Sequence, residues 1–256
     1  MTFVLTYHDV ASSGEEDECG FPGAAAARYK LTPSQFAAHL DAISATGRTV
    51  GLFPDRPDAA LSFDDGGASA PLIADALEQR GWRGHFFITT GRVGTKGFLA
   101  PDAIRELAAR GHDVGSHSVS HPTYMGLLSA TELSREWRHS RDALGEILGR
   151  PPASAAVPGG FVSEHVLREA ANAGYRLLLT SYPSGSSKWV DGMQVHGRYA
   201  VWARTSPGRA AGYARGDLLA RSTLWLASQA KTVPKRISPK TYELVRQGWA
   251  RRHTAR

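Results

Sequence analysis

The sequence contains a single cysteine, Cys19, in 256 residues. An internal disulfide is therefore excluded, and nothing indicates an oxidising compartment. Charged residues are also scarce, at 21% against 42% apolar residues, which argues against a disordered chain. The sequence has no apolar run of 18 residues that could span a membrane, and the apolar residues 2–8 are too few for a secretion signal. We expect a cytoplasmic protein, at most peripheral to a membrane.

Positive charge is concentrated near the C-terminal end. Residues 231–256 contain eight Lys or Arg residues but one acid, Glu243, whereas the whole chain has a net charge of +6. Such a segment can bind an anionic membrane surface or a phosphate-bearing glycolipid, although most such runs are solvated helix faces. We expect no specific nucleic-acid partner.

Short apolar runs alternate with helical patterns through most of the chain, which predicts parallel strands joined by helices. Pro residues at helix starts and Gly residues after the last turns support the helix boundaries. The expected strands are 3–8, 59–63, 85–89, 113–115, 154–157, 175–180 and 194–202. The expected helices are 33–46, 71–80, 101–110, 130–148 and 163–173.

This alternation fits either a barrel or an open doubly wound sheet. In both folds, ligand-binding loops follow the carboxyl ends of the parallel strands. Three polar clusters fall at such ends: His8-Asp9, Asp64-Asp65-Gly66, and Ser116 to His121. We therefore expect them to share one site. Two long segments interrupt the pattern: residues 11–30, a candidate lid, and residues 183–193, a turn-rich loop.

The chemistry-bearing residues are two histidines and two carboxylates. His117 and His121 lie four residues apart, so a helical turn would place both imidazoles on one face. Asp64 and Asp65 follow an apolar strand, where two adjacent negative charges need solvent or a cation. Two histidines and one carboxylate supply three metal ligands and leave positions open for water and substrate, as in a catalytic site. The second carboxylate is then free to act as a base.

These motifs resemble those of the polysaccharide-deacetylase (NodB-type) family. The resemblance is carried by SFDDG at 62–66 followed by GHDVGSHSVSHP at 111–122, with LTYHDV, GHFFITT and FLAPDAIRELAARGHDVGSH in supporting positions. It covers roughly residues 1–202 and implies a deformed (β/α) barrel of about seven parallel strands in a single domain. Residues 203–256 would form a helical, basic extension that packs on or beside the barrel.

The resemblance also implies roles for individual residues. Asp64 would be the general base, and Asp65, His117 and His121 would hold a divalent metal ion, usually zinc. The family's third motif normally supplies an arginine, but residues 155–161 contain none.

Three further assignments are less constrained by the motifs. Gly159 and Gly160 are candidates to expose backbone N–H groups to an oxyanion of the substrate. His196, in Val195-His196, is the nearest match to the histidine that protonates the leaving amine. His8 competes for that role or for substrate contact.

The expected activity is metal-dependent removal of an N-acetyl group from an amino sugar in a polysaccharide or oligosaccharide. One alternative is a deacylase or deformylase that acts on a lipid-linked or soluble sugar intermediate. Another is a barrel that binds carbohydrate without turnover. The sequence does not fix the acyl group, the sugar or the oligomeric state.

Overall fold

The computed structural model describes residues 1–160, 162–222 and 224, and contains one nine-stranded sheet. The strands are β1 (Phe3–Tyr7), β2 (Ala59–Phe63), β3 (His85–Ile88), β4 (Asp113–Ser116), β5 (Ser154–Ala156), β6 (Leu177–Leu179), β7 (Ser187–Val190), β8 (Met193–His196) and β9 (Tyr199–Ala200). The helices are α1 (Ala24–Ala27), α2 (Pro33–Ser44), α3 (Ala70–Glu78), α4 (Pro101–Ala109), α5 (Ala130–Leu148), α6 (Glu164–Asn172) and α7 (Pro207–Arg215).

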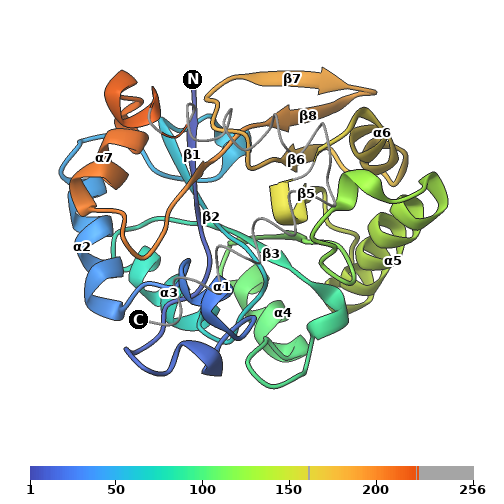
Figure 1. Cartoon of the computed structure of the whole chain (residues 1–256), viewed down its shortest axis with the longest axis horizontal. Coiled ribbons are helices and arrows are strands. Elements are labelled where there is room, and N and C mark those ends of the chain that lie inside the picture. The colour runs from blue at the N-terminus through green and yellow to red at the C-terminus, as the bar shows by residue number, and fades with distance from the viewer. Residues whose placement is uncertain (161, 223, 225–256) are drawn as a thin grey trace.

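The sheet is strongly curled, as in a deformed (β/α) barrel, although no strand pair within the described residues joins its two edges. Its strand order is β7-β8-β6-β5-β4-β3-β2-β1-β9, and every pair is parallel except β7 with β8. Strand β8 lies near one end of this order and β9 at the other, yet Gly197 and Arg198 alone separate them in the chain. The sheet must therefore curl until β8 and β9 lie close together. Figure 1 shows β1, β2, β3 and β5 in the middle of the molecule, helices at the left, bottom and right, and β7 at the outer edge at the top.

The predicted fold class is confirmed, with two local corrections. The expected strand 194–202 is two strands, because the chain leaves β6 at Gly197 and joins β1 at Tyr199. The expected loop 183–193 contains β7, an exposed strand that pairs with β8 as an antiparallel hairpin. Hydrophobic periodicity does not indicate β7, because turn residues flank it and none of its side chains is buried.

Local sequence explains the helix ends. Thr32 and Ser129 form capping boxes with Gln35 and Glu132, so the first turns of α2 and α5 have their free N–H groups satisfied. The Ser163 side chain caps α6 by accepting a hydrogen bond from the N–H of Val166, without a capping box. These caps fix the residue at which each of the three helices begins.

Helix α7 lies within the expected extension 203–256 and packs against α2 and β1, beside the barrel (Figure 1). Its Tyr213 is buried and stacks on Tyr199 of β9, with ring centroids 5.5 Å apart. The basic segment 231–256 lies outside the described residues. None of the described helices combines the length and the apolar character needed to cross a membrane.

Candidate active site

The two aspartates after β2 point to one place because the backbone turns between them. The N–H of Asp64 donates to the carbonyl of Tyr7 (3.0 Å), so Asp64 still extends the strand. At Asp65 the backbone has a positive φ of 79°, and Gly66 follows with φ 78°. In a regular strand, neighbouring side chains face opposite sides. The left-handed turn at Asp65 therefore brings both carboxylates to the carboxyl end of the barrel.

His117 and His121 come together by a different route from the helical turn expected from their spacing. His117 continues β4, since its N–H donates to Ile88 O (2.8 Å), and residues 117–121 are not helical. Positive φ angles at Ser118 (66°) and His121 (57°) reverse the chain instead. The imidazole centroids lie 5.0 Å apart. The expected pairing is thus correct, but the expected helix is wrong.

Glu136 of α5 holds this turn in place and was not expected from the sequence. One carboxylate oxygen accepts hydrogen bonds from the N–H groups of Val119 (2.8 Å) and Ser120 (2.9 Å). The other accepts from Ser120 Oγ (2.7 Å). Nothing in the local sequence distinguishes Glu136 from the other acids of α5, because its partners lie in a different element.

Asp65, His117 and His121 form a group that could hold a metal ion. One ligand atom from each of the three lies within 4.8 Å of the others. Asp65 Oδ1 is 3.6 Å from His117 Nε2 and 3.3 Å from His121 Nε2. The Nδ1 of His117 is bonded to the carbonyl of Ala156 (3.0 Å). A ring nitrogen that faces a carbonyl must carry the proton, so Nε2 of His117 has a free lone pair.

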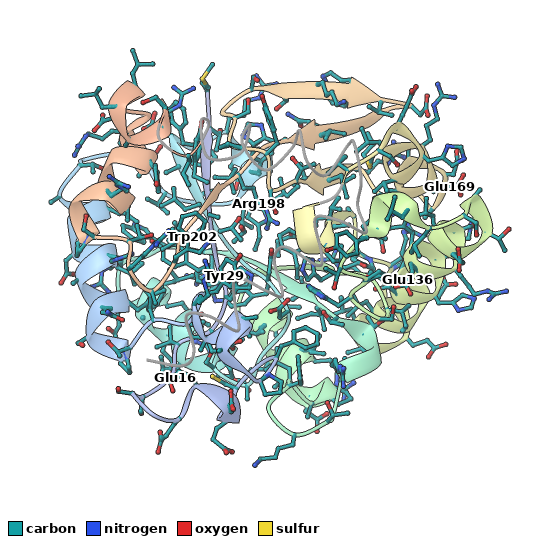
Figure 2. All side chains as sticks on the ribbon, viewed as in Figure 1. Glu16, Tyr29, Glu136, Glu169, Arg198 and Trp202 are labelled. Carbon is teal, nitrogen blue, oxygen red and sulfur yellow. The ribbon has the colours of Figure 1, made fainter. Side chains whose placement is uncertain are left out.

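Asp64 is bound by an arginine that the sequence analysis did not find. Arg198 is fully buried, and its two terminal nitrogens bond the two oxygens of Asp64 at 2.7 and 2.9 Å. It also donates to Ser62 Oγ (3.1 Å). Figure 2 shows Arg198 near the centre of the view, inside the ring of strands. The arginine beside the aspartates thus comes from between β8 and β9, whereas residues 155–161 contain none. The available signal was a single arginine within the expected strand 194–202.

The surroundings of Asp64 and Asp65 shift the pKa values of these two carboxylates in opposite directions. Burial alone would raise the pKa of Asp64, but the Arg198 guanidinium and His117 hold it below its ordinary value. Burial raises the pKa of Asp65 to about 7, and the neighbouring carboxylates of Asp64 and Asp9 add to this effect. Burial lowers the pKa of His117 to about 3 and also lowers that of His121. At neutral pH, Asp64 is ionised and both imidazoles are neutral, as metal ligands must be.

His8 lies beside the aspartates, at the end of β1. Its positive charge, when present, lowers the pKa of both Asp64 and Asp65. Its Nδ1 is buried without a hydrogen-bond partner, and its ring lies 4.6 Å from that of Tyr29. This ring nitrogen is therefore available to a ligand at the edge of the site.

His196 is placed elsewhere, and its expected role as the proton donor is corrected. Its Nε2 bonds the carbonyl of Thr2 (3.0 Å), which precedes β1, and its Nδ1 bonds Ser187 Oγ (2.8 Å). Its ring packs on Phe53, which precedes β2. The His196 ring therefore faces the amino ends of β1 and β2, whereas the aspartates follow the carboxyl end of β2. Burial also lowers the pKa of His196 to about 4.

Gly159 and Gly160 form a tight turn after β5, with φ angles of 63° and 69°. A Cβ on Gly159 would lie 2.4 Å from the carbonyl oxygen of Thr123, so only glycine lets this turn approach the segment that follows His121. The contact with an oxyanion stays a prediction.

Comparison with known proteins gives a consistent result. Residues 54–178 match the family model described as polysaccharide deacetylase. A chitin deacetylase from Colletotrichum lindemuthianum is 32% identical over 124 residues, which is 48% of this chain and 50% of the relative. A peptidoglycan-N-acetylglucosamine deacetylase from Bacillus cereus is 26% identical over 134 residues, or 52% of this chain and 60% of the relative. The chain thus spans about half the length of the curated relatives it matches.

The fold comparison extends over more of the chain. The crystal structure of a polysaccharide deacetylase from Bacillus cereus superposes with a TM-score of 0.69 at 20% identity. The superposition covers 83% of this chain and 68% of that one, so the barrel is shared well beyond residues 54–178. The matched segment contains Asp64, Asp65, His117 and His121, the residues that converge in the structure. The chain therefore carries a segment of the polysaccharide deacetylase type at residues 54–178.

Proposed function

We propose that the protein is a metal-dependent hydrolase that removes an N-acetyl group from an amino sugar in a polysaccharide or oligosaccharide. The observation that carries this proposal is the convergence of Asp65, His117 and His121 on one point, with Asp64 beside them. The relatives named as deacetylases of chitin and of peptidoglycan N-acetylglucosamine support the choice of the acetamido group.

The three ligands fit a divalent metal ion, and we propose zinc. Asp65 Oδ1 is buried without a hydrogen-bond partner, which is costly for a carboxylate unless a cation is present. Two neutral imidazoles and one carboxylate are a ligand set typical of catalytic zinc. A bound divalent ion lowers the pKa of water towards 7 and polarises a carbonyl group.

Asp64 is the proposed general base. Its carboxylate stays ionised at neutral pH because of Arg198, and each of its oxygens has a second lone pair available for a water molecule. Arg198 fixes the plane of the carboxylate, so that a proton is taken from one direction. A positioned base of this kind contributes on the order of 10²–10⁴ in rate.

His8 replaces His196 as the proposed proton donor to the leaving amine. His8 lies at the same barrel end as Asp64 and has an unpartnered ring nitrogen, whereas both nitrogens of His196 are bonded at the other end. Replacement of His8 by Gln would then lower kcat, whereas replacement of a residue that only binds substrate would mainly raise KM.

The test is acetate release from N-acetylglucosamine oligomers by the zinc-loaded protein, with formate release from N-formyl oligomers in parallel. Asp64→Asn is expected to keep stoichiometric metal and to lose at least about 10²-fold in rate. His117→Ala is expected to lose both metal and activity. The exposed His165 of α6 offers the matched control, because His165→Ala leaves both unchanged. Near-normal rates for Asp64→Asn, or release of formate alone, would contradict the proposal.

A further inference from the structure

One wall of the site comes from the long segment before α2. The ring of Phe21 lies 4.8 Å from that of His121, and it meets Phe98 edge-on at 5.1 Å. The same segment supplies Tyr29, which lies against His8. Residues 11–30 are therefore part of the site and not a detached loop.

This wall is held firmly by a buried lysine. Lys30 is 5% exposed, and its ammonium donates to the carbonyls of Glu16, Cys19 (2.6 Å) and Phe21 (2.7 Å). An ammonium has three protons to donate, so this carbonyl cage uses all of them. The backbone that carries Phe21 is thereby fixed before any substrate arrives.

Arg92 packs against the rings of this wall. It ends the short 3-10 helix Thr90–Arg92 after β3, and the N–H groups of Thr90 and Gly91 donate to the carbonyls of Ser118 and Val119. The position of Arg92 is thus tied to the turn that carries His117 and His121. Its guanidinium stacks on the rings of Phe21 (5.3 Å) and Phe98 (6.0 Å).

The charge of Arg92 is available to a ligand. The residue is exposed, and among residues 1–160, 162–222 and 224 no carboxylate lies within ion-pair distance of it. The nearby Lys96, by contrast, is paired with Glu18 (3.0 Å). A planar guanidinium held on two rings needs little further ordering to bind a carboxylate or phosphate with two hydrogen bonds.

We propose that Arg92, stacked on Phe21 and Phe98 beside His121, is a subsite for an anionic substituent on the sugar substrate. The proposal rests on the proposed function, because it concerns how the same site selects its substrate. The Phe21 ring contacts both His121 and Arg92, so Arg92 is one ring removed from the metal ligands. It is therefore placed to contact a neighbouring sugar unit and not the acetyl group that is cleaved.

The experiment compares three tetrasaccharides with the wild-type protein and its variants. One contains N-acetylglucosamine alone, one alternates it with N-acetylmuramic acid and so carries carboxylates, and one carries a phosphate ester. We expect a preference for an acidic tetrasaccharide in kcat/KM, expressed through KM. Arg92→Gln should reduce that preference about tenfold. Lys96→Gln, which removes a nearby charge that is already paired, should leave it unchanged.

Several outcomes would overturn the subsite. They are a wild-type protein without preference for either acidic tetrasaccharide, an Arg92→Gln variant that keeps the preference, or an equal loss in Lys96→Gln. If the wild-type protein deacetylates none of the three, the proposed function fails by itself. The subsite is then decided by calorimetric binding, where Arg92→Gln should raise the Kd for the acidic sugars about tenfold, and equal Kd values reject it.

Discussion

The pairing of Asp64 with Arg198 distinguishes the two aspartates and singles out Asp64 as the proposed base. Both carboxylates are buried and adjacent in the sequence, yet their pKa values move in opposite directions. Asp64 has a guanidinium bonded to both of its oxygens, whereas Asp65 Oδ1 has no hydrogen-bond partner. The sequence predicts that the two aspartates share a site. It does not predict this division of roles, because the distinguishing arginine lies 134 residues away.

Replacement of Arg198 by Met should be severe, because it leaves the charge of Asp64 buried and unpaired. We expect a loss of about 3–5 kcal/mol in the free energy of unfolding, measured with urea. The second replacement Asp64→Asn should restore much of that loss, since it removes the unpaired charge. A double variant as unstable as Arg198→Met would mean that Arg198 acts through packing and not through its charge.

Asp65 gives a pH-dependent effect in the metal-free protein. Its pKa is raised in the folded state to about 7 from 3.8, so its favourable contribution is present below pH 4 and is lost as the pH rises to 7. Asp65→Asn has no such titration. The stability of Asp65→Asn relative to wild type should therefore rise between pH 4 and 7, by at most about 1.4 kcal/mol per pH unit. Saturating zinc should reverse the order at pH 7. Thermal melts with a chelator and with zinc measure both effects. A stability difference between Asp65→Asn and wild type that does not change with pH would contradict the raised pKa of Asp65.

At the scale of elements, the site depends on turns and not on the strands themselves. The turns at Asp65 and at residues 117–121 both use positive φ angles at residues other than glycine. Strand and helix positions followed from apolar periodicity and from Pro, Ser and Gly punctuation, and most boundaries agreed within two residues. The turn at 117–121 could not be predicted, because it is specified by Glu136 from another helix.

Glu136→Gln tests the importance of that turn. The neutral amide oxygen accepts the two N–H bonds more weakly than a carboxylate, and the NH2 group can meet Ser120 Oγ only if this hydroxyl turns to accept. We expect zinc affinity to fall about 10–100-fold, as is typical when the support of a metal ligand is removed. Zinc titration with a chromophoric chelator measures this. Glu146→Gln, at an exposed position of the same helix, is the matched control and should bind zinc like the wild type.

At the scale of the whole molecule, the two ends of the barrel have different tasks. The carboxyl ends of the strands carry the site. The amino ends carry a buried polar network in which Asp113 accepts hydrogen bonds from His85 Nδ1 (2.7 Å) and Ser154 Oγ (2.6 Å). The N–H of Phe53 donates to Nε2 of His85, so both ring nitrogens of this histidine are hydrogen-bonded. This division between ends followed from the fold class, but the members of the network did not.

Asp113→Asn should therefore separate stability from function. Loss of the charge weakens the bonds from His85 and Ser154, at a cost of about 1–3 kcal/mol in the free energy of unfolding. Zinc affinity and kcat at a temperature well below the melting point should stay at wild-type values. Urea denaturation and zinc titration of the same preparation check both. A fall in zinc affinity as large as that of Glu136→Gln would show that the two ends are coupled.

The residue that orients the proposed base lies where the chain crosses between the two sides of the curled sheet. Arg198 lies between β8, the strand next to one edge of the sheet, and β9, the strand at the other edge. A nascent or partly folded chain can bring its aspartates and histidines together early, since β1 to β4 come first. Because Arg198 orients the proposed base, we expect hydrolysis to appear during refolding only after β9 has docked, so that its appearance would report the final step of assembly.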